Sequence, residues 1–328
     1  MENEKILEVQ NLCTTFNTER GKMKAIDGVS FDVYKGTIVG VVGESGCGKS
    51  VTSQSIMRLY DEKRQASYTG KVLLNGENIF DIPAKKMEQI RGAKISMVFQ
   101  DALSSLNPVF TVGSQIAETL KIHQNMGKKE ARKEAVEMLR LVGIPDPEKR
   151  IDQYPHELSG GMRQRVMIAI ALACKPELLI ADEPTTALDV TIQAQIMDLI
   201  VDLNKKLNMG VILITHDLAV VAQMCQKVVV MYLGQIVEEG TVEEIFSNPT
   251  HPYTLGLIKS IPKLNGDRSE RLYMIKGMVP LLSQIPTGCR FAPRCPYATE
   301  KCTKTMPDLN AIGDSEHKVR CWRCEGER

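Results

Sequence analysis

The sequence is poor in aromatic residues, has no excess of either charge and contains no long apolar run. Phe, Trp and Tyr make up 5% of its 328 residues, and Lys+Arg (41) nearly balance Asp+Glu (40) for a net charge of +1. This balance argues against binding nucleic acid through a broad basic surface. No apolar stretch approaches the ~18 residues of a membrane-spanning helix, and Met1 to Lys5 show no secretion-signal pattern. We therefore expect a cytosolic chain that reaches a membrane only through a partner.

Cysteine is sparse over most of the chain, with nine residues in total. Five of the nine lie within the final 40 residues, namely Cys289, Cys295, Cys302, Cys321 and Cys324. In a reducing cytosol, such a cluster indicates a metal site before a disulfide framework. Prolines also multiply beyond about residue 250. Composition therefore predicts a large body followed by a separate, loop-rich, Cys-rich C-terminal appendage.

The body alternates between strand and helix patterns. Apolar alternation or short apolar runs predict strands around Val29–Val33, Ile38–Val42, Val72–Leu74, Ile95–Phe99, Leu178–Ala181 and Val211–Thr215. Helical periodicity covers about 112–142 and about 191–207. This β-helix-β alternation predicts a parallel sheet with crossover helices. The runs 228–232 and 235–237, around Gly234, predict a closing hairpin.

The residues Gly43 to Ser50 match G-x-x-x-x-G-K-[ST], the pattern of a phosphate-binding P-loop. Its glycines let backbone N–H groups face phosphate oxygens at a helix start. Lys49 can then reach the β- and γ-phosphates, and the Ser50 hydroxyl can bind Mg²⁺. A chance Gly-rich turn is the alternative, but the preceding apolar strand and following helix favour the P-loop. The predicted nucleotide contacts are Gly43, Ser45, Gly46, Cys47, Gly48, Lys49, Ser50 and Val51.

An acidic pair, Asp182 and Glu183, follows the apolar run 178–181. A carboxylate at the end of a strand beside a P-loop strand can hold the Mg²⁺ shell, and this is the role predicted for Asp182. Glu183 is then the predicted general base for an attacking water. Alone, an apolar strand ending in Asp-Glu is more often a solvated turn; the P-loop makes the catalytic interpretation the stronger one.

The run Leu158-Ser159-Gly160-Gly161-Met162 resembles the signature motif of ATP-binding-cassette (ABC) ATPases, with Met162 where that family usually has Gln. Ser159 can cap the helix that follows, and the two glycines leave N–H groups accessible to an anion. The resemblance implies that Ser159, Gly160 and Gly161 contact the γ-phosphate of ATP held on a partner subunit. Two chains would then enclose two nucleotides.

Further positions match the same family in order. By this resemblance, Gln100 is the Q-loop glutamine that senses Mg²⁺, and Asp189 closes the D-loop Ala187-Leu188-Asp189. His216 is the switch histidine, and Phe16 is the aromatic residue that stacks on adenine, although a single Phe there is more often a core residue. The implied fold is an α/β P-loop NTPase of ABC type, with a mixed or parallel sheet core, an antiparallel β subdomain and a helical subdomain. The predicted domains are residues 1–248, with the helical subdomain at about 102–165, and the appendage at 249–328.

The appendage, from His251-Pro252-Tyr253-Thr254 onward, resembles the C-terminal extension of the oligopeptide/dipeptide branch of ABC importers, and within it the D-type ATPase subunits of dipeptide permeases. This resemblance implies a [4Fe-4S] cluster on Cys289, Cys295, Cys302 and Cys321, with Cys324 as a possible alternative ligand. Thiolates suit iron–sulfur clusters and Zn²⁺ alike. A structural zinc and reduced thiols therefore stay open.

The resemblance implies an ATP-hydrolysing motor subunit of a di- or oligopeptide importer, peripheral at the cytoplasmic face of the membrane. Its implied partners are a homologous F-type ATPase subunit, two transmembrane permease subunits and an extracytoplasmic peptide-binding protein, with no nucleic acid. The alternatives are a soluble ABC ATPase acting on ribosomes or DNA, an importer for another solute such as nickel, and an ATP-gated scaffold or redox sensor.

Overall fold

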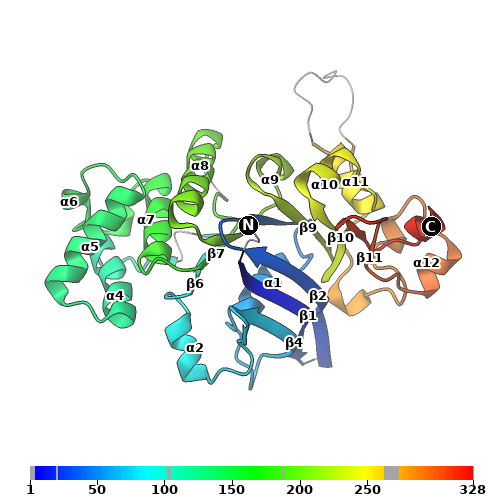
Figure 1. Cartoon of the computed structure of the whole chain (residues 1–328), viewed down its shortest axis with the longest axis horizontal. Coiled ribbons are helices and arrows are strands. Elements are labelled where there is room, and N and C mark those ends of the chain that lie inside the picture. Colours follow the sequence, from blue (N-terminus) through cyan, green and yellow to red (C-terminus); the bar gives the residue numbers. More distant parts are fainter. Residues whose placement is uncertain (1–3, 20, 102–104, 187, 262–272, 328) are drawn as a thin grey trace. The chain divides into compact units, whose positions relative to one another are not determined.

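The computed structural model describes residues 4–19, 21–101, 105–186, 188–261 and 273–327 (Figure 1). The chain divides into two compact units. The first unit comprises Met1–Leu7, Val33–Thr37 and Asp81–Leu213; the second comprises Glu8–Asp32, Ile38–Phe80 and Ile214–Arg328. The P-loop and the Cys-rich appendage therefore belong to the same unit.

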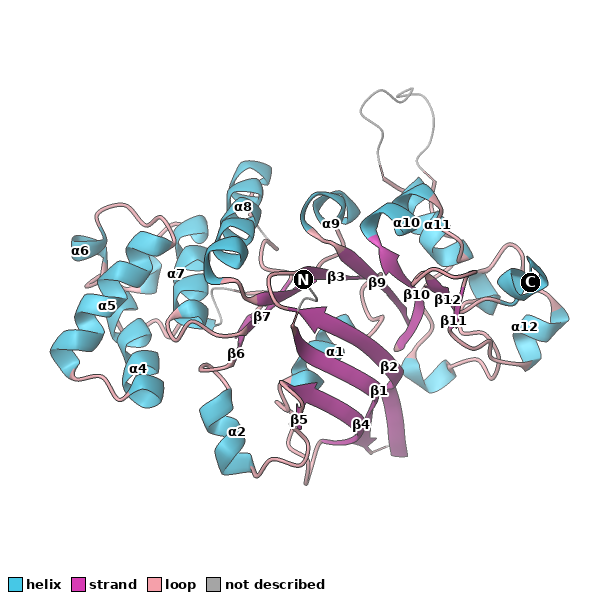
Figure 2. Ribbon diagram, in the orientation of Figure 1, coloured by secondary structure: helices cyan, strands magenta, loops and turns pink. Residues whose placement is uncertain are grey.

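One sheet has the strand order β2-β1-β4-β5, and most of its residues belong to the second unit (Figure 2). Its strands are β1 (Lys5–Thr18), β2 (Gly21–Tyr34), β4 (Ala66–Leu74) and β5 (Glu77–Asn78). The predicted alternation is present in β2, where Val29, Phe31 and Val33 are buried while their neighbours are half-buried. The predicted strand at 72–74 is the end of β4, which pairs antiparallel with β5.

The second unit also contains five strands in the order β11-β12-β10-β9-β3. They are β3 (Ile38–Val42), β9 (Lys227–Tyr232), β10 (Gln235–Thr241), β11 (Asn310–Ala311) and β12 (Lys318–Val319). Strands β3 and β9 are parallel, whereas β9–β10, β10–β12 and β11–β12 are antiparallel. The appendage predicted from the sequence contributes β12 to this sheet, because β12 pairs with β10.

The helices of the second unit are mostly short. They are α1 (Lys49–Ile56), α9 (Leu218–Met224), α10 (Val242–Ser247), α11 (Pro252–Lys259) and α12 (Glu300–Lys304), with 3-10 turns at Leu282–Gln284, Ala292–Arg294 and Trp322–Glu327.

The first unit carries three strands in the order β8-β7-β6. They are β6 (Ile95–Val98), β7 (Leu178–Asp182) and β8 (Gly210–Ile214). Strands β6 and β7 are parallel, with Val98 opposite Ala181. Because parallel strands end at the same sheet edge, the residues that follow β6 and β7 are brought to one place.

The helices of the first unit are α2 (Ala84–Ile90), α4 (Val112–Gln124), α5 (Lys128–Leu141), α6 (Pro147–Arg150), α7 (Gly160–Leu172) and α8 (Val190–Leu207), with a 3-10 turn at Pro155–Glu157. Helices α4 to α7 lie together in Figure 1. The helical pattern predicted over 112–142 is two helices, because Asn125 takes a left-handed conformation (φ 52°) that ends α4. Residues 102–104, where the helical subdomain was predicted to start, lie outside the described residues. Helix α7 continues past the predicted end at 165.

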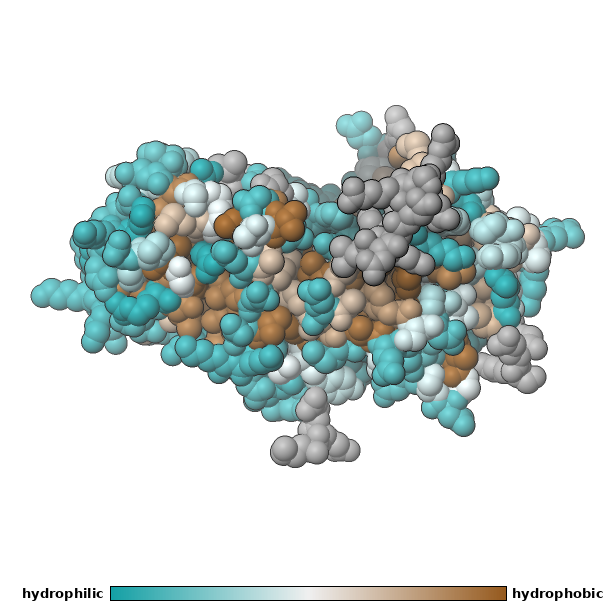
Figure 3. All heavy atoms as spheres, turned by 90° about the horizontal axis from the view of Figure 1, so that it is seen from above, coloured by the Kyte–Doolittle hydropathy of each residue, from teal (hydrophilic) through white to brown (hydrophobic). Residues whose placement is uncertain are grey.

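The strands that precede the predicted motifs are deeply buried. Every residue of β3, β7 and β8 is buried. Polar side chains cover much of the face in Figure 3, with hydrophobic side chains visible among them. Among the described helices, none combines the length and the apolar character needed to cross a bilayer.

Candidate nucleotide site

The P-loop connects β3 to α1 within the second unit. Gly43, Gly46 and Gly48 all have positive φ angles (152°, 81° and 99°), where a side chain is strained. At Gly43 there is also no room, since a Cβ would lie 2.3 Å from the Met231 carbonyl oxygen. A Cβ at Gly48 would lie 2.8 Å from Ile26 Cδ1, the end of a side chain that can move aside. The φ angles therefore favour glycine at all three positions, and at Gly43 the backbone contact adds to that requirement.

Lys49 is the first residue of α1 and is 5% exposed. Its Nζ donates hydrogen bonds to the carbonyl oxygens of Gly43 (2.8 Å) and Glu44 (3.2 Å). The neighbouring Cys47 is fully buried, and burial raises the pKa of its thiol. Ser50 and Val51 continue the helix and are half-buried. The side chain of Lys49, near the end of the motif, thus contacts the backbone of the first two residues of the same loop.

His216 follows β8, and its segment is joined to the P-loop strand. The N–H of Thr215 donates to the carbonyl of Val41 (3.3 Å), near the end of β3. Asp217 caps α9, because its Oδ1 accepts from Ala219 N (2.9 Å) and Val220 N (3.3 Å). These bonds fix the backbone on both sides of His216, whose side chain is exposed.

Phe16 lies on β1 and is half-buried. Its ring packs edge-on against Tyr60, with ring centroids 4.8 Å apart. This contact fixes the orientation of the Phe16 ring without burying it. The structure is therefore compatible with both interpretations of the sequence, in which Phe16 either stacks on adenine or is a packing residue.

Gln100 and Glu183 meet in the first unit, just past the ends of β6 and β7. The Gln100 amide Nε2 donates to Glu183 Oε2 (3.1 Å), and the Thr186 hydroxyl donates to the same oxygen (3.1 Å). Asp182, the last residue of β7, is 3% exposed. Sequence reasoning named Gln100, Asp182 and Glu183, but it did not identify Thr186.

Glu183 has a φ of 46°. A left-handed conformation at a residue with a side chain costs about 1–3 kcal/mol and persists only where the surrounding structure enforces it. The turn directs the Glu183 carboxylate to Gln100 and Thr186 rather than into the strand. Such local strain is most common at functional sites, and here it falls on the residue that the sequence predicts as the base.

The signature residues begin α7, and the D-loop residues precede α8. Ser159 Oγ accepts from Met162 N (3.4 Å), and Asp189 Oδ1 accepts from Ile192 N (2.9 Å), so both side chains are helix caps. Ser159 and Gly160 are exposed. Gly161 is not free to change, since a Cβ there would lie 2.7 Å from Ile192 Cγ2. Ala187 of the predicted D-loop lies outside the described residues.

The five thiols of the appendage are all half-buried, and none is in a disulfide. Burial raises the pKa of Cys289 to about 11 and also raises the pKa of Cys295, and the charges of Cys302 and Cys321 add to both shifts. A hydrogen bond with Cys324 lowers the pKa of Cys321 to about 7. The thiols are thus electrostatic neighbours. Within the described residues, however, no three His, Cys, Asp or Glu side chains are arranged to hold a single metal ion.

Two contacts to the P-loop come from residues to which the sequence assigned no contact with nucleotide. Tyr253 of α11 accepts a hydrogen bond from Glu44 N, and the Arg294 guanidinium pairs with the Glu44 carboxylate. Tyr253 belongs to the His-Pro-Tyr-Thr run, which was used only for its resemblance to a transporter family. In the sequence, only the position of Glu44 inside the P-loop points to these contacts, and it does not indicate which residues Glu44 pairs with.

The fold and these motifs define an ABC-type ATP-binding cassette, and comparison with known proteins agrees. The family model for the ABC transporter matches residues 26–186, and the model for the oligopeptide/dipeptide transporter C-terminal region matches 237–302. A solved dimeric cassette, MJ0796 bound to ADP and Pi, has a TM-score of 0.64 at 28% identity, covering 72% of this chain and 99% of its own. The cassette cbiO1 from Clostridium perfringens also has a TM-score of 0.64, at 30% identity over 75% and 92% of the two chains.

Comparison with similar sequences narrows the family further. The dipeptide transport ATP-binding protein DppD of Bacillus subtilis is 53% identical, covering 97% of this chain and 95% of its own length. The oligopeptide transport ATP-binding protein AppD of the same organism is 51% identical over 98% of both, and a probable peptide ABC transporter ATP-binding protein of Sinorhizobium fredii is 52% identical over 97% and 95%. This chain belongs to the ATP-binding subunits of the peptide ABC transporters.

Proposed function

We propose that the chain hydrolyses ATP as the motor subunit of a di- or oligopeptide importer. The observation that carries the hydrolysis is the pairing of Glu183 with Gln100 just past the ends of two parallel strands. The Glu183 carboxylate takes the proton of an attacking water, while the amide of Gln100 holds that carboxylate in orientation. His216 contacts the γ-phosphate. The names of the relatives favour import over the soluble ATPase acting on ribosomes or DNA.

The P-loop residues hold the triphosphate. Lys49 supplies the cation for the β- and γ-phosphates, and Phe16 stacks on the adenine. Ser50, Gln100 and Asp182 would hold Mg²⁺, which neutralises phosphate charge when it is bound. The P-loop residues that would contact the nucleotide are Gly43, Ser45, Gly46, Cys47, Gly48, Lys49, Ser50 and Val51.

A second ATPase subunit completes the proposal. Ser159, Gly160, Gly161 and Asp189 would contact the nucleotide held on that subunit, and the exposure of Ser159 and Gly160 supports this role. We propose a homologous F-type ATPase subunit as the partner. The similar cassette MJ0796 is described as dimeric, which supports pairing in general.

The membrane partners would be two permease subunits, served by an extracytoplasmic peptide-binding protein. The first unit offers a surface suited to a permease, since Val109, Phe110 and Ile122 are 71%, 54% and 64% exposed. Phe110 and Ile122 line a cavity of about 360 Å³ together with Gln115 and Glu118. Exposed apolar side chains beside such a hollow are typical of a protein interface. The chain would then be peripheral at the cytoplasmic face, with no nucleic acid partner.

We also propose the domain boundary at 248/249 and a metal centre beyond it. The two family models match separate ranges, 26–186 and 237–302, which supports a cassette followed by an extension. Thiolates are the ligands that a [4Fe-4S] cluster takes, so the chemistry of these four side chains supports the proposal. Cys289, Cys295, Cys302 and Cys321 would hold the cluster, with Cys324 as an alternative ligand and Zn²⁺ as the alternative metal. Such a centre stabilises a small, loop-rich segment.

The base assignment is tested with Glu183→Gln in the complete transporter. The variant keeps the size and the hydrogen-bonding amide but cannot accept the proton, so we expect ATP binding to persist while turnover falls about 10²-fold or more. Asp198→Asn, an exposed acid-to-amide change on α8, is the matched control and should keep full turnover. Unchanged turnover in Glu183→Gln would refute the base assignment.

The cargo is tested in the same complex by uptake into vesicles. Labelled dipeptide should enter in the wild type and the Asp198→Asn control, and not in Glu183→Gln. Uptake of nickel in place of peptide would support the alternative cargo, and ATPase activity without any uptake would support the soluble ATPase.

A further inference from the structure

Two side chains of the C-terminal extension (residues 249–328) contact the second residue of the P-loop, Glu44. All three residues belong to the second unit. Tyr253 and Arg294 are 209 and 250 positions away from Glu44 in the sequence. The extension therefore contributes directly to the surroundings of the phosphate-binding loop.

Tyr253 holds the backbone of Glu44. Its hydroxyl accepts a hydrogen bond from Glu44 N at 2.7 Å, and its side chain is fully buried. The Tyr253 ring packs against Tyr232 and Phe291, with centroids 4.8 and 5.4 Å away. A rigid, buried ring of this kind fixes the position of the oxygen that it carries.

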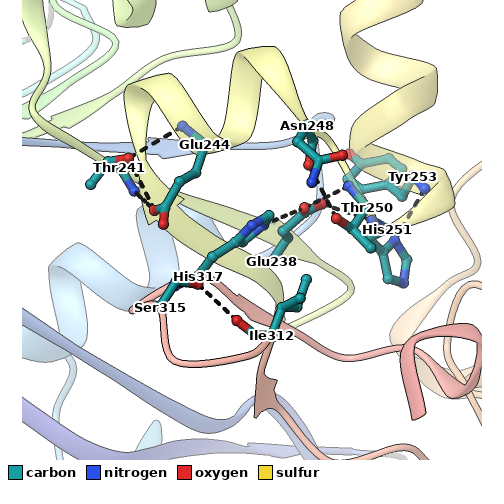
Figure 4. Close-up of polar contacts among 10 residues, drawn as sticks. All are labelled: Glu238, Thr241, Glu244, Asn248, Thr250, His251, Tyr253, Ile312, Ser315 and His317. Carbon is teal, nitrogen blue, oxygen red and sulfur yellow. Dashed lines mark hydrogen bonds and ion pairs between the residues drawn. The ribbon is translucent and has the colours of Figure 1, made fainter. Parts of the chain in front are cut away.

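The start of α11 is itself anchored, which holds Tyr253 in place (Figure 4). The buried carboxylate of Glu238 accepts from Thr250 N (2.8 Å) and His251 N (2.9 Å). His251 Nδ1 in turn accepts from Tyr253 N (3.1 Å). The chain from β10 to the Tyr253 hydroxyl is thus a continuous set of hydrogen bonds and covalent links.

Arg294 holds the side chain of Glu44. Its Nη1 and Nη2 donate to Glu44 Oε2 (2.6 Å) and Oε1 (3.0 Å), which is the two-pronged pairing that arginine makes with a carboxylate. Its Nε donates to Lys276 O (3.0 Å), and further bonds reach Gly277 O (3.2 Å) and the Tyr232 hydroxyl (3.4 Å). The Arg294 side chain is 4% exposed. A buried guanidinium with five hydrogen bonds has one orientation.

Glu44 connects these contacts to the P-loop lysine. The carbonyls of Gly43 and Glu44 accept from Lys49 Nζ, and Cys47 N donates to the Glu44 carbonyl (3.2 Å). A shift of Glu44 would therefore move the acceptors of Lys49. In addition, a carboxylate inside a loop that receives phosphates repels them unless a cation compensates its charge.

We propose that Arg294 and Tyr253 are positioning residues for nucleotide binding: the C-terminal extension holds the P-loop in shape and neutralises the Glu44 carboxylate. The inference rests on the proposed use of ATP. It assigns to the extension a part in nucleotide affinity, and that part is independent of which metal, if any, its thiols bind.

The test measures ATP affinity of the full-length chain by titration calorimetry. Arg294→Met keeps the length of the stem but leaves the Glu44 charge uncompensated, so we expect the Kd for ATP to rise about tenfold. Tyr253→Phe removes one hydroxyl and should raise it about threefold. Lys304→Met, which removes an exposed cation of the same extension (69% exposed), should leave the Kd unchanged.

A charge-rescue variant separates positioning from a general loss of folding. Glu44→Gln removes the charge that Arg294 compensates, so the double variant Glu44→Gln/Arg294→Met should return to within about threefold of wild type. The fluorescence of Trp322 in the extension shows in each variant whether that extension is folded. In the complete transporter, Arg294→Met should raise KM for ATP much more than it lowers kcat.

The outcomes distinguish a failure of the proposed function from a failure of the positioning role. If the wild type does not bind ATP, the proposed function fails. If the wild type binds ATP but Arg294→Met and Tyr253→Phe bind equally well, the positioning role is overturned. If Arg294→Met weakens binding and Glu44→Gln does not rescue it, or if weakening occurs only where the Trp322 signal shows an unfolded extension, the charge-compensating role is likewise overturned.

Discussion

Glu238 provides the sharpest test of how the extension is attached. The residue lies on β10 with 0% exposure, and its carboxylate accepts three hydrogen bonds. Oε1 accepts from Thr250 N (2.8 Å) and is 2.8 Å from His317 Nε2, while Oε2 accepts from His251 N (2.9 Å). All three partners belong to the extension, so a change at one side chain removes several attachments together (Figure 4).

Glu238→Ala leaves two buried polar groups, on His251 and His317, and the half-buried N–H of Thr250 without their acceptor. At ~1–3 kcal/mol for each buried unsatisfied group, the free energy of unfolding should fall by at least about 2 kcal/mol. Glu238→Gln keeps the size and one carbonyl oxygen, but it directs an NH₂ group at one N–H donor. One hydrogen bond is then lost, at a cost of about 1–3 kcal/mol. The predicted order of destabilisation is Ala, then Gln, then wild type.

The assay is urea unfolding followed by the fluorescence of Trp322, the one tryptophan of the chain, which lies within the extension. Its indole N–H donates to the Thr305 carbonyl (3.0 Å) inside that segment. Glu243→Ala, on the exposed face of α10, is the control and should change stability by less than about 0.5 kcal/mol. The reasoning is refuted if Glu238→Ala behaves like Glu243→Ala, or if Gln is as damaging as Ala.

The remaining predictions concern protonation and metal. Burial lowers the pKa of His251 to about 4, against 6.5 for the unfolded chain, partly opposed by Glu238. Between these two pKa values the imidazole is protonated in the unfolded state but not in the folded state. The contribution of His251 to the free energy of unfolding is therefore complete above pH ~6.5 and should fall by roughly 2 kcal/mol between pH 7 and 5. His251→Asn, which can still cap α11, should reduce this pH dependence when it is measured by urea unfolding. For the thiols, chemical analysis of anaerobically purified protein should give about four irons and four sulfides per chain if the cluster is present, and about one zinc without sulfide would contradict it.

The parts of the site that the sequence predicts are those encoded by short-range patterns. The apolar strand, glycines and lysine of the P-loop lie within a dozen residues, and the positive φ angles at Gly43 and Gly48 are a property of that local turn. Ser159 and Asp189 were likewise predictable in position, because a cap is defined by the helix that follows it.

Contacts between distant segments were not predictable in the same way. Gln100 and Glu183 were each named, but their hydrogen bond follows from the parallel pairing of Val98 with Ala181, which no local periodicity states. Thr186 was missed because a hydroxyl in a turn has no distinguishing pattern. The helical pattern at 112–142 gave no sign of the break at Asn125, since two consecutive amphipathic helices have the same periodicity as one.

The extension shows why composition alone gave an incomplete picture. Prolines and cysteines predicted a loop-rich segment with its own metal centre, but they do not indicate how the segment packs. In the structure, Tyr253, Phe291 and Arg290 of this segment are buried, and Arg290 is paired with Asp27 of β2. A segment that buries aromatic rings and adds a strand to a sheet folds together with that sheet. A change in the extension would then also act on the phosphate-binding loop, which Tyr253 and Arg294 contact.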